Sequence, residues 1–308
     1  MRQRVAFATV AILMLAGCAG PAVRPKAAPA AVPAASASAA SSPSVPGSGA
    51  LTGDNIDLPQ SSRYQHQSDS GPIQPPERIA DLPEPTPVPL PRSRYGNRSP
   101  YTVLGHTYHV LKSAKGYDKR GIASWYGRKF NGYMTSSFEK YDMYKFTAAH
   151  KTLPLPTWAR VTNLENGKSV IVRINDRGPF VANRLIDLSY AAAVRIGIWP
   201  KGTGLVEVQA IDPKHPGELL PPVAVQSPGV QPGIWLQVGA FADPVNADRM
   251  VRRLRNAGIG PIRVTRIHVH GQRVQRVRLG PLHSVSAADR LARKVKRLGL
   301  PQPQVAVD

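Results

Sequence analysis

Apolar residues are patterned into two segments that can build a core, and the rest of the chain lacks such a pattern. From about residue 19 to 98, no apolar spacing of 2 or 3.6 residues is sustained, and Ala, Pro and Ser dominate. A shorter Pro-rich stretch covers 213–232. The pattern predicts a disordered tether at 18–98, a middle domain at 99–212 and a C-terminal domain at 233–308.

The middle domain has the pattern of short β-strands. Strand-like segments occupy residues 121–127, 159–163 and 169–174. Between the last two, Asn166 and Gly167 are typical of a tight hairpin turn. One helix is expected at 190–195, with Ser189 as its cap and Gly197 as its end. These elements predict a mainly β domain, a compact barrel with one or two short helices.

The C-terminal domain combines strand and helix patterns. Along 234–241, aliphatic residues alternate with aromatic, amide and glycine residues, which predicts one aliphatic face and one aromatic and polar face. Helical spacing runs to Gly258 and resumes after a Ser286/Asp289 capping box. Further strands are expected at 262–270, 272–279 and 304–307. This βαββαβ order predicts an α+β domain whose four-stranded antiparallel sheet carries both helices on one face and leaves the other face free.

The N-terminus indicates where the protein works. Arg2 and Arg4 precede an apolar run that ends at Leu15, and this run is too short to span a bilayer as a helix. It predicts a secretory signal peptide at 1–17. Cys18 is the single cysteine of the chain and has no intramolecular disulfide partner. An ordinary signal peptide followed by a chance cysteine is the alternative interpretation.

The sequence Leu15-Ala16-Gly17-Cys18 resembles the lipobox of bacterial lipoproteins. The resemblance implies that Cys18 is acylated and anchors the protein to a membrane, each buried methylene contributing about 0.8 kcal/mol. Ala19, rather than Asp, after the cysteine implies export to the inner leaflet of the outer membrane. A flexible tether of this length spans roughly 50 Å, which is enough to reach the peptidoglycan layer.

The net charge of +21 needs an explanation. Inside a cell it would indicate a nucleic acid partner, but export excludes that partner. The anionic partners that remain are the cell wall and acidic lipid head groups. The alternative is that the charge only keeps the protein soluble.

Few side chains of the middle domain are candidates for chemistry, and no nucleophile, zinc or phosphate-loop motif is present. The unusual acids and bases are Glu139, Asp142, His150 and Asp176. Asp176 follows a strand and has Arg173 and Arg177 nearby, whereas Glu139 and Asp142 are expected to share one side of a helical turn. Paired carboxyl groups across a groove suit the cleavage of a glycosidic bond. In the alternative interpretation, Asp142 caps a turn and His150 is a hydrogen-bonded core residue. Asp176 then pairs with Arg177.

Several motifs of the middle domain, in order, resemble the rare lipoprotein A family of septal-ring lytic transglycosylases. They begin at Gly121 (GIASWYG), Thr147 (TAAHKTLPLP), Arg160 (RVTNLENG), Asn175 (NDRGPF) and Ile186 (IDLSYAA). The resemblance implies a six-stranded double-psi β-barrel. It implies catalytic roles for Asp176, Glu139, His150 and Asp142, with Asp176 as the principal acid/base, and glycan contacts for Trp125, Tyr126, Arg173, Asn175 and Arg177. Two residues depart from the family pattern: Asn131 replaces a common His, and Phe138 replaces a common Gly.

The C-terminal domain resembles the SPOR domain, through Val238-Gly-Ala-Phe241 and Arg276-Val-Arg-Leu-Gly-Pro281. We expect the sheet face opposite the helices to bind glycan. The side chains expected on this platform are Trp235, Gln237, Phe241, Arg276 and Arg278. Aromatic rings stack on sugars, while amides and guanidinium groups donate hydrogen bonds to sugar oxygens. The resemblance implies binding to glycan strands without stem peptides at division sites.

These resemblances imply an outer-membrane lipoprotein that cleaves peptidoglycan at the division septum and forms 1,6-anhydro-N-acetylmuramic acid ends. The substrate's own hydroxyl is the nucleophile, so we expect no metal or cofactor. Peptide-free glycan and a membrane are the expected partners, with divisome proteins as further candidates and no nucleic acid. A noncatalytic wall-binding protein and a hydrolase on the same barrel are the alternatives.

Overall fold

The computed structural model describes residues 68–73, 78–215, 232–269 and 271–307. The predicted signal peptide, Cys18, most of the tether and the linker from 216 to 231 lie outside the described residues. Within the described part of the chain, no helix is long and apolar enough to cross a membrane.

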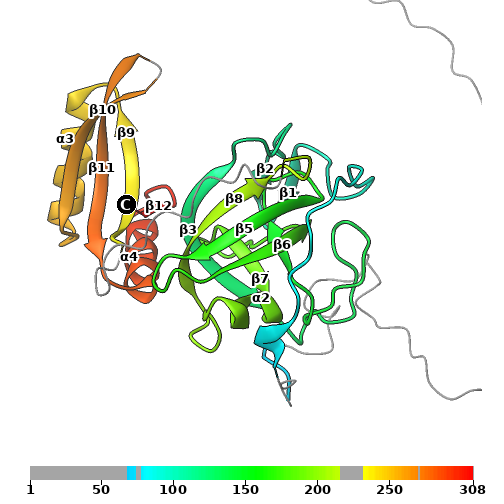
Figure 1. Cartoon of the computed structure of the whole chain (residues 1–308). Helices are drawn as coiled ribbons and strands as arrows, with labels where there is room; N and C mark the ends of the chain where they lie inside the picture. The colour runs from blue at the N-terminus through cyan, green and yellow to red at the C-terminus, as the bar shows by residue number, and fades with distance from the viewer. Residues whose placement is uncertain (1–67, 74–77, 216–231, 270, 308) are drawn as a thin grey trace, which may run out of the picture. The chain divides into compact units, whose positions relative to one another are not determined.

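Six strands close into a barrel (Figure 1), as predicted from the sequence. They are β3 (Asp118–Tyr126), β4 (Thr147–His150), β5 (Thr157–Asn163), β6 (Ser169–Asp176), β7 (Ile186–Ser189) and β8 (Gly204–Ile211). Around the barrel they follow the order β3-β7-β4-β6-β5-β8, with β3–β7 and β4–β6 parallel and the other pairs antiparallel. Fully buried aliphatic side chains such as Ala148, Val172 and Leu188 form its core.

The short helix α2 (Tyr190–Arg195) begins where the sequence predicts. Ser189 has extended backbone angles and its Oγ accepts a hydrogen bond from the Ala192 N–H at 3.3 Å, which caps the helix. Gly197 follows the helix with a φ of +73°, a conformation that glycine adopts without steric cost.

Residues before position 99 already contact the barrel, so the packed region begins earlier than the expected boundary. After the short 3₁₀-helix η2 (Ile79–Asp81), the Val88 carbonyl accepts a hydrogen bond from the Trp158 indole at 2.9 Å. We call residues 93–98 the N-terminal arm; its Ser93 N–H donates to the Leu155 carbonyl at 2.8 Å. Backbone hydrogen bonds of this kind need no apolar periodicity, which is why the sequence pattern did not reveal them.

A two-stranded hairpin follows the N-terminal arm. It consists of β1 (Tyr101–Val103) and β2 (His106–Tyr108), paired antiparallel. The rings of Tyr101 and Tyr108 stack with centroids 5.4 Å apart, and both lie near Phe180. The hairpin therefore adds an aromatic cluster beside the loop that follows β6.

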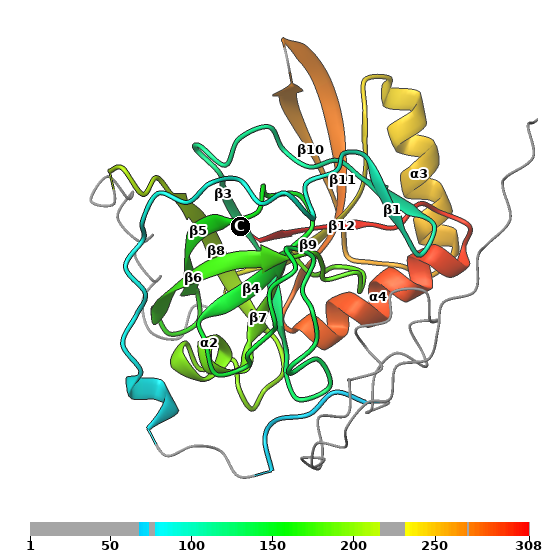
Figure 2. The same cartoon turned by 90° about the vertical axis from the view of Figure 1, so that its right-hand side faces the viewer.

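The C-terminal domain has the predicted βαββαβ order (Figure 2). Its elements are β9 (Ile234–Phe241), α3 (Pro244–Asn256), β10 (Ile262–Val269), β11 (Gln272–Leu282), α4 (Val285–Arg297) and β12 (Gln304–Val307). The strands form an antiparallel sheet in the order β10-β11-β9-β12. Buried residues of both helices, among them Val251 and Val295, share one core with Leu236, so both helices cover the same face. The cap of α4 is Ser284, which accepts from the Ala287 N–H at 3.2 Å, and this corrects the expected capping box at Ser286.

An irregularity in β9 changes which residues share a face. Gly239 pairs with Val277 but Gln237 pairs with Arg278, so Val238 is an extra residue on β9. Such a bulge reverses the alternation of side chains beyond it. Phe241 consequently packs against the helix-side core, and the expected platform loses this residue.

Candidate active site

Asp176 lies at the end of β6 with one carboxylate oxygen fully engaged. Its Oδ1 accepts hydrogen bonds from the Ser136 N–H at 2.8 Å, the Ser136 hydroxyl at 2.7 Å and the Arg177 N–H at 2.7 Å. No residue in the described part of the chain donates to Oδ2. Burial raises the pKa of Asp176, and the donated hydrogen bonds only partly oppose it. Asp176 therefore retains a proton more readily than an ordinary aspartate, and Oδ2 is the oxygen left to carry it.

Glu139 has the opposite electrostatic environment. Burial would raise its pKa, but hydrogen bonds and charge from Arg173, with a hydrogen bond from Asn175, outweigh this effect and lower the pKa. Both terminal nitrogens of Arg173 donate to the carboxylate, one of them at 2.8 Å. Asn175 Nδ2 donates to Oε2 at 3.2 Å. Glu139 is thus held as a carboxylate, while Arg173 and Asn175, expected to bind glycan, are engaged with it.

Asp142 does not share a helical turn with Glu139, in contrast to the sequence-based expectation. Residues 139–142 form no helix, and Asp142 accepts a hydrogen bond from the Tyr144 N–H at 3.0 Å. This is the turn-stabilising role that we considered as the alternative. Asn131, one of the two departures from the family pattern, also supports this loop because its side-chain oxygen accepts from the Met143 N–H at 2.9 Å.

His150 is a buried residue whose two ring nitrogens are both occupied. Nδ1 accepts from the backbone N–H groups of Thr152 and Leu153, and Nε2 lies 2.9 Å from the Tyr117 hydroxyl. Burial, aided by the nearby charges of Lys151 and Arg177, lowers the pKa of His150 to about 3. The ring stays neutral and makes no hydrogen bond to Asp176, so the geometry gives no support to the catalytic role expected for His150.

Arg177 is also a structural residue rather than an open glycan ligand. Its guanidinium donates to the carbonyls of Gly96 at 2.7 Å, His150 at 3.0 Å and Leu153 at 2.5 Å. Only its backbone N–H contacts Asp176, so the considered ion pair between the two side chains is not the arrangement found. The side chain instead fastens the N-terminal arm and the 150–153 loop beside the candidate acid.

Tyr126 packs inside the protein, and Trp125 is partly buried against the same core. The Trp125 ring contacts Tyr190 and Trp199 edge-on. Tyr126 is 5% exposed and stacks on Tyr141 with ring centroids 4.2 Å apart. The burial of Tyr126 gives no support to its expected glycan contact, whereas the contact expected for Trp125 stays a prediction.

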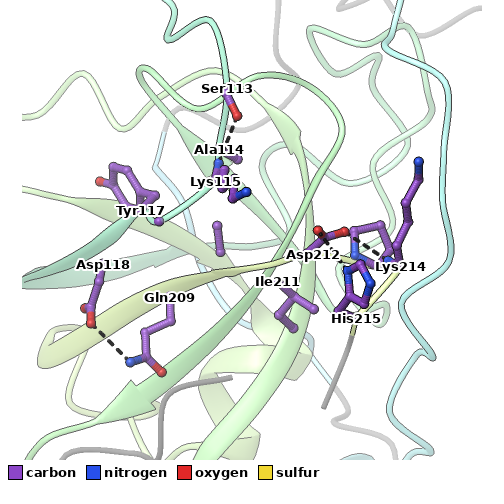
Figure 3. A pocket seen from close by; sticks show the side chains of 13 residues that line it. Ser113, Ala114, Lys115, Tyr117, Asp118, Gln209, Ile211, Asp212, Lys214 and His215 are labelled. Carbon is purple, nitrogen blue, oxygen red and sulfur yellow. Dashed lines mark hydrogen bonds and ion pairs between the residues drawn. The ribbon is translucent and has the colours of Figure 1, made fainter. Parts of the chain in front are cut away.

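Two hollows differ in their relation to Asp176. The larger, about 640 Å³, lies between segments 113–118 and 209–215 and contains none of the candidate catalytic residues (Figure 3). Its lining residues bind one another; for example, Gln209 Nε2 donates a hydrogen bond to Asp118 at 3.2 Å. The smaller, about 260 Å³, is lined by Ser136, Arg177, Tyr101 and Phe180, among others. The smaller hollow adjoins the candidate active site, because two of its lining residues, Ser136 and Arg177, donate hydrogen bonds to Asp176.

Asp187 is a potential site residue that the sequence reasoning did not select. Strand pairing sets Asp187 of β7 and Asp176 of β6 on either side of Ala149 in β4. Burial, with a contribution from Asp69, raises the pKa of Asp187 to about 7, although Ser124 donates a hydrogen bond to it. Its Oδ1 is buried and has no partner among the described residues. Its position in the IDLS motif was visible in the sequence, but the burial that alters its proton affinity was not.

The expected glycan platform of the C-terminal sheet is less open than predicted. Trp235 is 6% and Arg278 7% exposed, and Gln237 and Arg276 are half-buried. The guanidinium of Arg263 lies over the Trp235 ring, 5.5 Å from its centroid. Because Trp235, Gln237 and Arg278 still share the face opposite the helices, the structure keeps the predicted grouping except for Phe241.

Comparisons with known proteins match both folded parts. Residues 118–210 match the double-psi barrel family described as lytic transglycolase, and residues 231–306 match the SPOR domain. The endolytic peptidoglycan transglycosylase RlpA of Pseudomonas aeruginosa (strain UCBPP-PA14) is 38% identical over 270 residues, which cover 71% of this chain and 79% of that protein.

Two further relatives match single parts of the chain. The protein of the same name from Neisseria meningitidis (strain Z2491) is 54% identical over 117 residues, 38% of this chain and 48% of its own length. The crystal structure of the RlpA SPOR domain from Pseudomonas aeruginosa is 32% identical, covers 24% of this chain and 97% of that chain, and has a TM-score of 0.23. Because a relative that is 38% identical covers 71% of this chain, and both domains match family models, this chain belongs to the RlpA family of endolytic peptidoglycan transglycosylases.

Proposed function

We propose that this protein cleaves the glycan of peptidoglycan by lytic transglycosylation and leaves 1,6-anhydro-N-acetylmuramic acid ends. The observation that carries this proposal is the contrast between two carboxyl groups of the barrel. Asp176 has a raised pKa and an unengaged Oδ2, whereas Glu139 is held ionised by Arg173. One proton donor and one fixed negative charge are what cleavage of a glycosidic bond requires.

The proposed reaction needs no water. Protonated Asp176 donates its proton to the glycosidic oxygen as the bond to the anomeric carbon of the muramic acid breaks. The ionised Glu139 stabilises the positive charge that develops on the sugar ring. The 6-hydroxyl of the same sugar then attacks the anomeric carbon and gives its proton to the Asp176 carboxylate, which restores the starting state.

The substrate and location are finer proposals that rest on the SPOR domain and the N-terminal sequence. The substrate is glycan without stem peptides, bound by the C-terminal sheet and cleaved by the barrel. The protein is anchored through acylated Cys18 in the outer membrane, faces the periplasm and concentrates at the septum. Peptide-free strands carry a free lactyl carboxylate on each muramic acid, which suits a chain with a net charge of +21.

Product analysis tests the proposed reaction. We expect the full chain to convert purified, peptide-free glycan into fragments with anhydro ends, measured by mass spectrometry. Asp176→Asn keeps the shape but cannot donate a proton, so its rate should fall by about 100- to 10,000-fold while glycan binding persists. Reducing ends would instead identify a hydrolase, and binding without cleavage by the wild type would identify a noncatalytic wall-binding protein.

A further inference from the structure

Two aromatic side chains of this chain are exposed together. The rings of Tyr95 and Phe138 lie 4.3 Å apart, centroid to centroid, with a 34° angle between their planes. Although they contact each other, Tyr95 is 45% and Phe138 53% exposed. Exposed aromatic pairs of this kind are typical of binding surfaces. We call Tyr95 and Phe138 the aromatic shelf.

The aromatic shelf is fixed beside the candidate active site. Phe138 directly precedes Glu139 and is two residues from Ser136, which holds Asp176. On the other side, Gly96 follows Tyr95 and packs so closely on the Ser136 carbonyl that a Cβ at Gly96 would lie 2.7 Å from it. The Gly96 carbonyl also accepts from Arg177. The shelf therefore forms part of the rim around the two carboxyl groups.

The backbone at Phe138 indicates that the ring is there for a reason other than folding. Its φ of +64° lies in the left-handed region, which residues with a Cβ rarely adopt. Glycine would hold the same backbone without strain. A strained, exposed aromatic residue next to a catalytic candidate supports a functional role.

We propose that the aromatic shelf is a sugar-binding subsite that stacks on the apolar face of a pyranose ring of the glycan strand cleaved at Asp176. This inference rests on the proposed function, because it takes the glycan strand as the ligand. The C–H groups on one face of a pyranose carry partial positive charge and pack on the electron-rich face of an aromatic ring. Arg94, whose guanidinium lies 5.9 Å from the Tyr95 ring centroid, adds a cation for the oxygens of the same sugar.

The main test replaces Phe138 with glycine in the full chain. Phe138→Gly removes the ring and also relieves the backbone strain, so the melting temperature should stay the same or rise. The subsite should be lost, and KM for peptide-free glycan should rise about tenfold, equivalent to about 1.4 kcal/mol. The value of kcat should change by less than about twofold, because the contact is made equally in the ground state and the transition state. Phe138→Trp should keep KM near the wild-type value.

Leu104→Gly is the matched control. Leu104, between β1 and β2, also has a positive φ, 50°, and is 72% exposed, so the same substitution relieves strain and removes an exposed apolar side chain that is not part of the shelf. Its KM should be unchanged. An unchanged KM in Phe138→Gly, or an equal rise in Leu104→Gly, would overturn the proposal.

A binding experiment separates failure of the subsite from failure of the proposed function. Full-length Asp176→Asn protein is titrated with a peptide-free tetrasaccharide of the glycan, and the ring resonances of Tyr95 and Phe138 are followed by NMR. We expect both to shift, and this readout stands even if the wild-type protein cleaves nothing. Ring resonances that do not shift, as expected for a surface that contacts another protein instead, would contradict the sugar subsite.

Discussion

At the scale of single residues, the two carboxyl groups of the candidate site have pKa values shifted in opposite directions. Their neighbours cause this difference, because the groups themselves are chemically alike. Desolvation is the largest influence on the pKa of both groups. At Asp176 it outweighs the donated hydrogen bonds, whereas at Glu139 the contacts with Arg173 and Asn175 together outweigh it.

The sequence identified both residues as candidates, but it predicted Arg173 near Asp176 and paired Glu139 with Asp142, whereas Arg173 binds Glu139. It could not show that His150 is internally satisfied or that Arg177 binds carbonyls, because these contacts come from segments distant in sequence.

Asp187 allows a prediction about pH and stability. Its pKa is raised in the folded protein to about 7, so between about pH 4 and 7 the folded state keeps a proton that the unfolded state loses. The contribution of Asp187 to the free energy of unfolding is fully present below pH 4. It is lost as the pH rises to 7, by at most about 1.4 kcal/mol per pH unit. Asp187→Asn should therefore gain stability relative to the wild type over this range, measured by urea unfolding at several pH values. Parallel stability curves for the two proteins would contradict the raised pKa.

At the scale of elements, periodicity predicted the strands and helices of the C-terminal domain. In the rest of the described chain it predicted only β3, β5, β6 and α2, and it missed β1, β2, β4, β7 and β8. Within the C-terminal sheet, one error occurs where a single residue changes the register. The bulge at Val238 inserts one residue into β9 and moves Phe241 to the core side, although the sequence still alternates. The N-terminal arm was missed because its sequence carries no strand or helix pattern. It has no apolar period and is held by polar contacts to the barrel, chiefly those of Asn97.

Asn97 offers a test of how the N-terminal arm is held. Its amide nitrogen donates to the Leu155 carbonyl at 2.7 Å, and its amide oxygen accepts from the Leu155 N–H at 2.8 Å. Asn97→Ala removes the partner of the Leu155 N–H in a fully buried residue, while the Leu155 carbonyl keeps the hydrogen bond from Ser93. The substitution should destabilise the protein by about 2 kcal/mol in chemical unfolding. Exposed Gln272→Ala, the control, should change stability by less than about 0.5 kcal/mol. Equal effects of the two substitutions would show that Asn97 does not anchor the arm.

At the scale of the whole molecule, composition and motifs predicted two folded domains, and each has the expected topology. We propose that the barrel cleaves the glycan and that the C-terminal sheet recruits the protein to the septum. The burial of Trp235 and Arg278 could not be deduced from strand alternation, because alternation indicates a face but not what covers it.

The membrane anchor is tested by Cys18→Ala. The variant should fold normally but leave the membrane fraction, because acyl chains supply the proposed attachment. Fractionation after a high-salt wash, which removes electrostatic attachment of this cationic chain, is the measurement. Sedimentation of the variant with membranes at the wild-type level would contradict the lipid anchor.

Septal recruitment is tested by a chain that ends at residue 232. The proposal assigns binding of peptide-free glycan to the sheet face that carries Gln237 and Arg276, so the truncated protein should lose enrichment at the septum in fluorescence microscopy. The barrel has its own closed sheet and core, and the truncated chain should still release anhydro-ended fragments from soluble glycan. Thermal unfolding of the purified truncated chain is the control for folding. If a folded, active truncated protein still concentrates at septa, recruitment must come from the barrel or from a protein partner, and the role assigned to the C-terminal sheet is wrong.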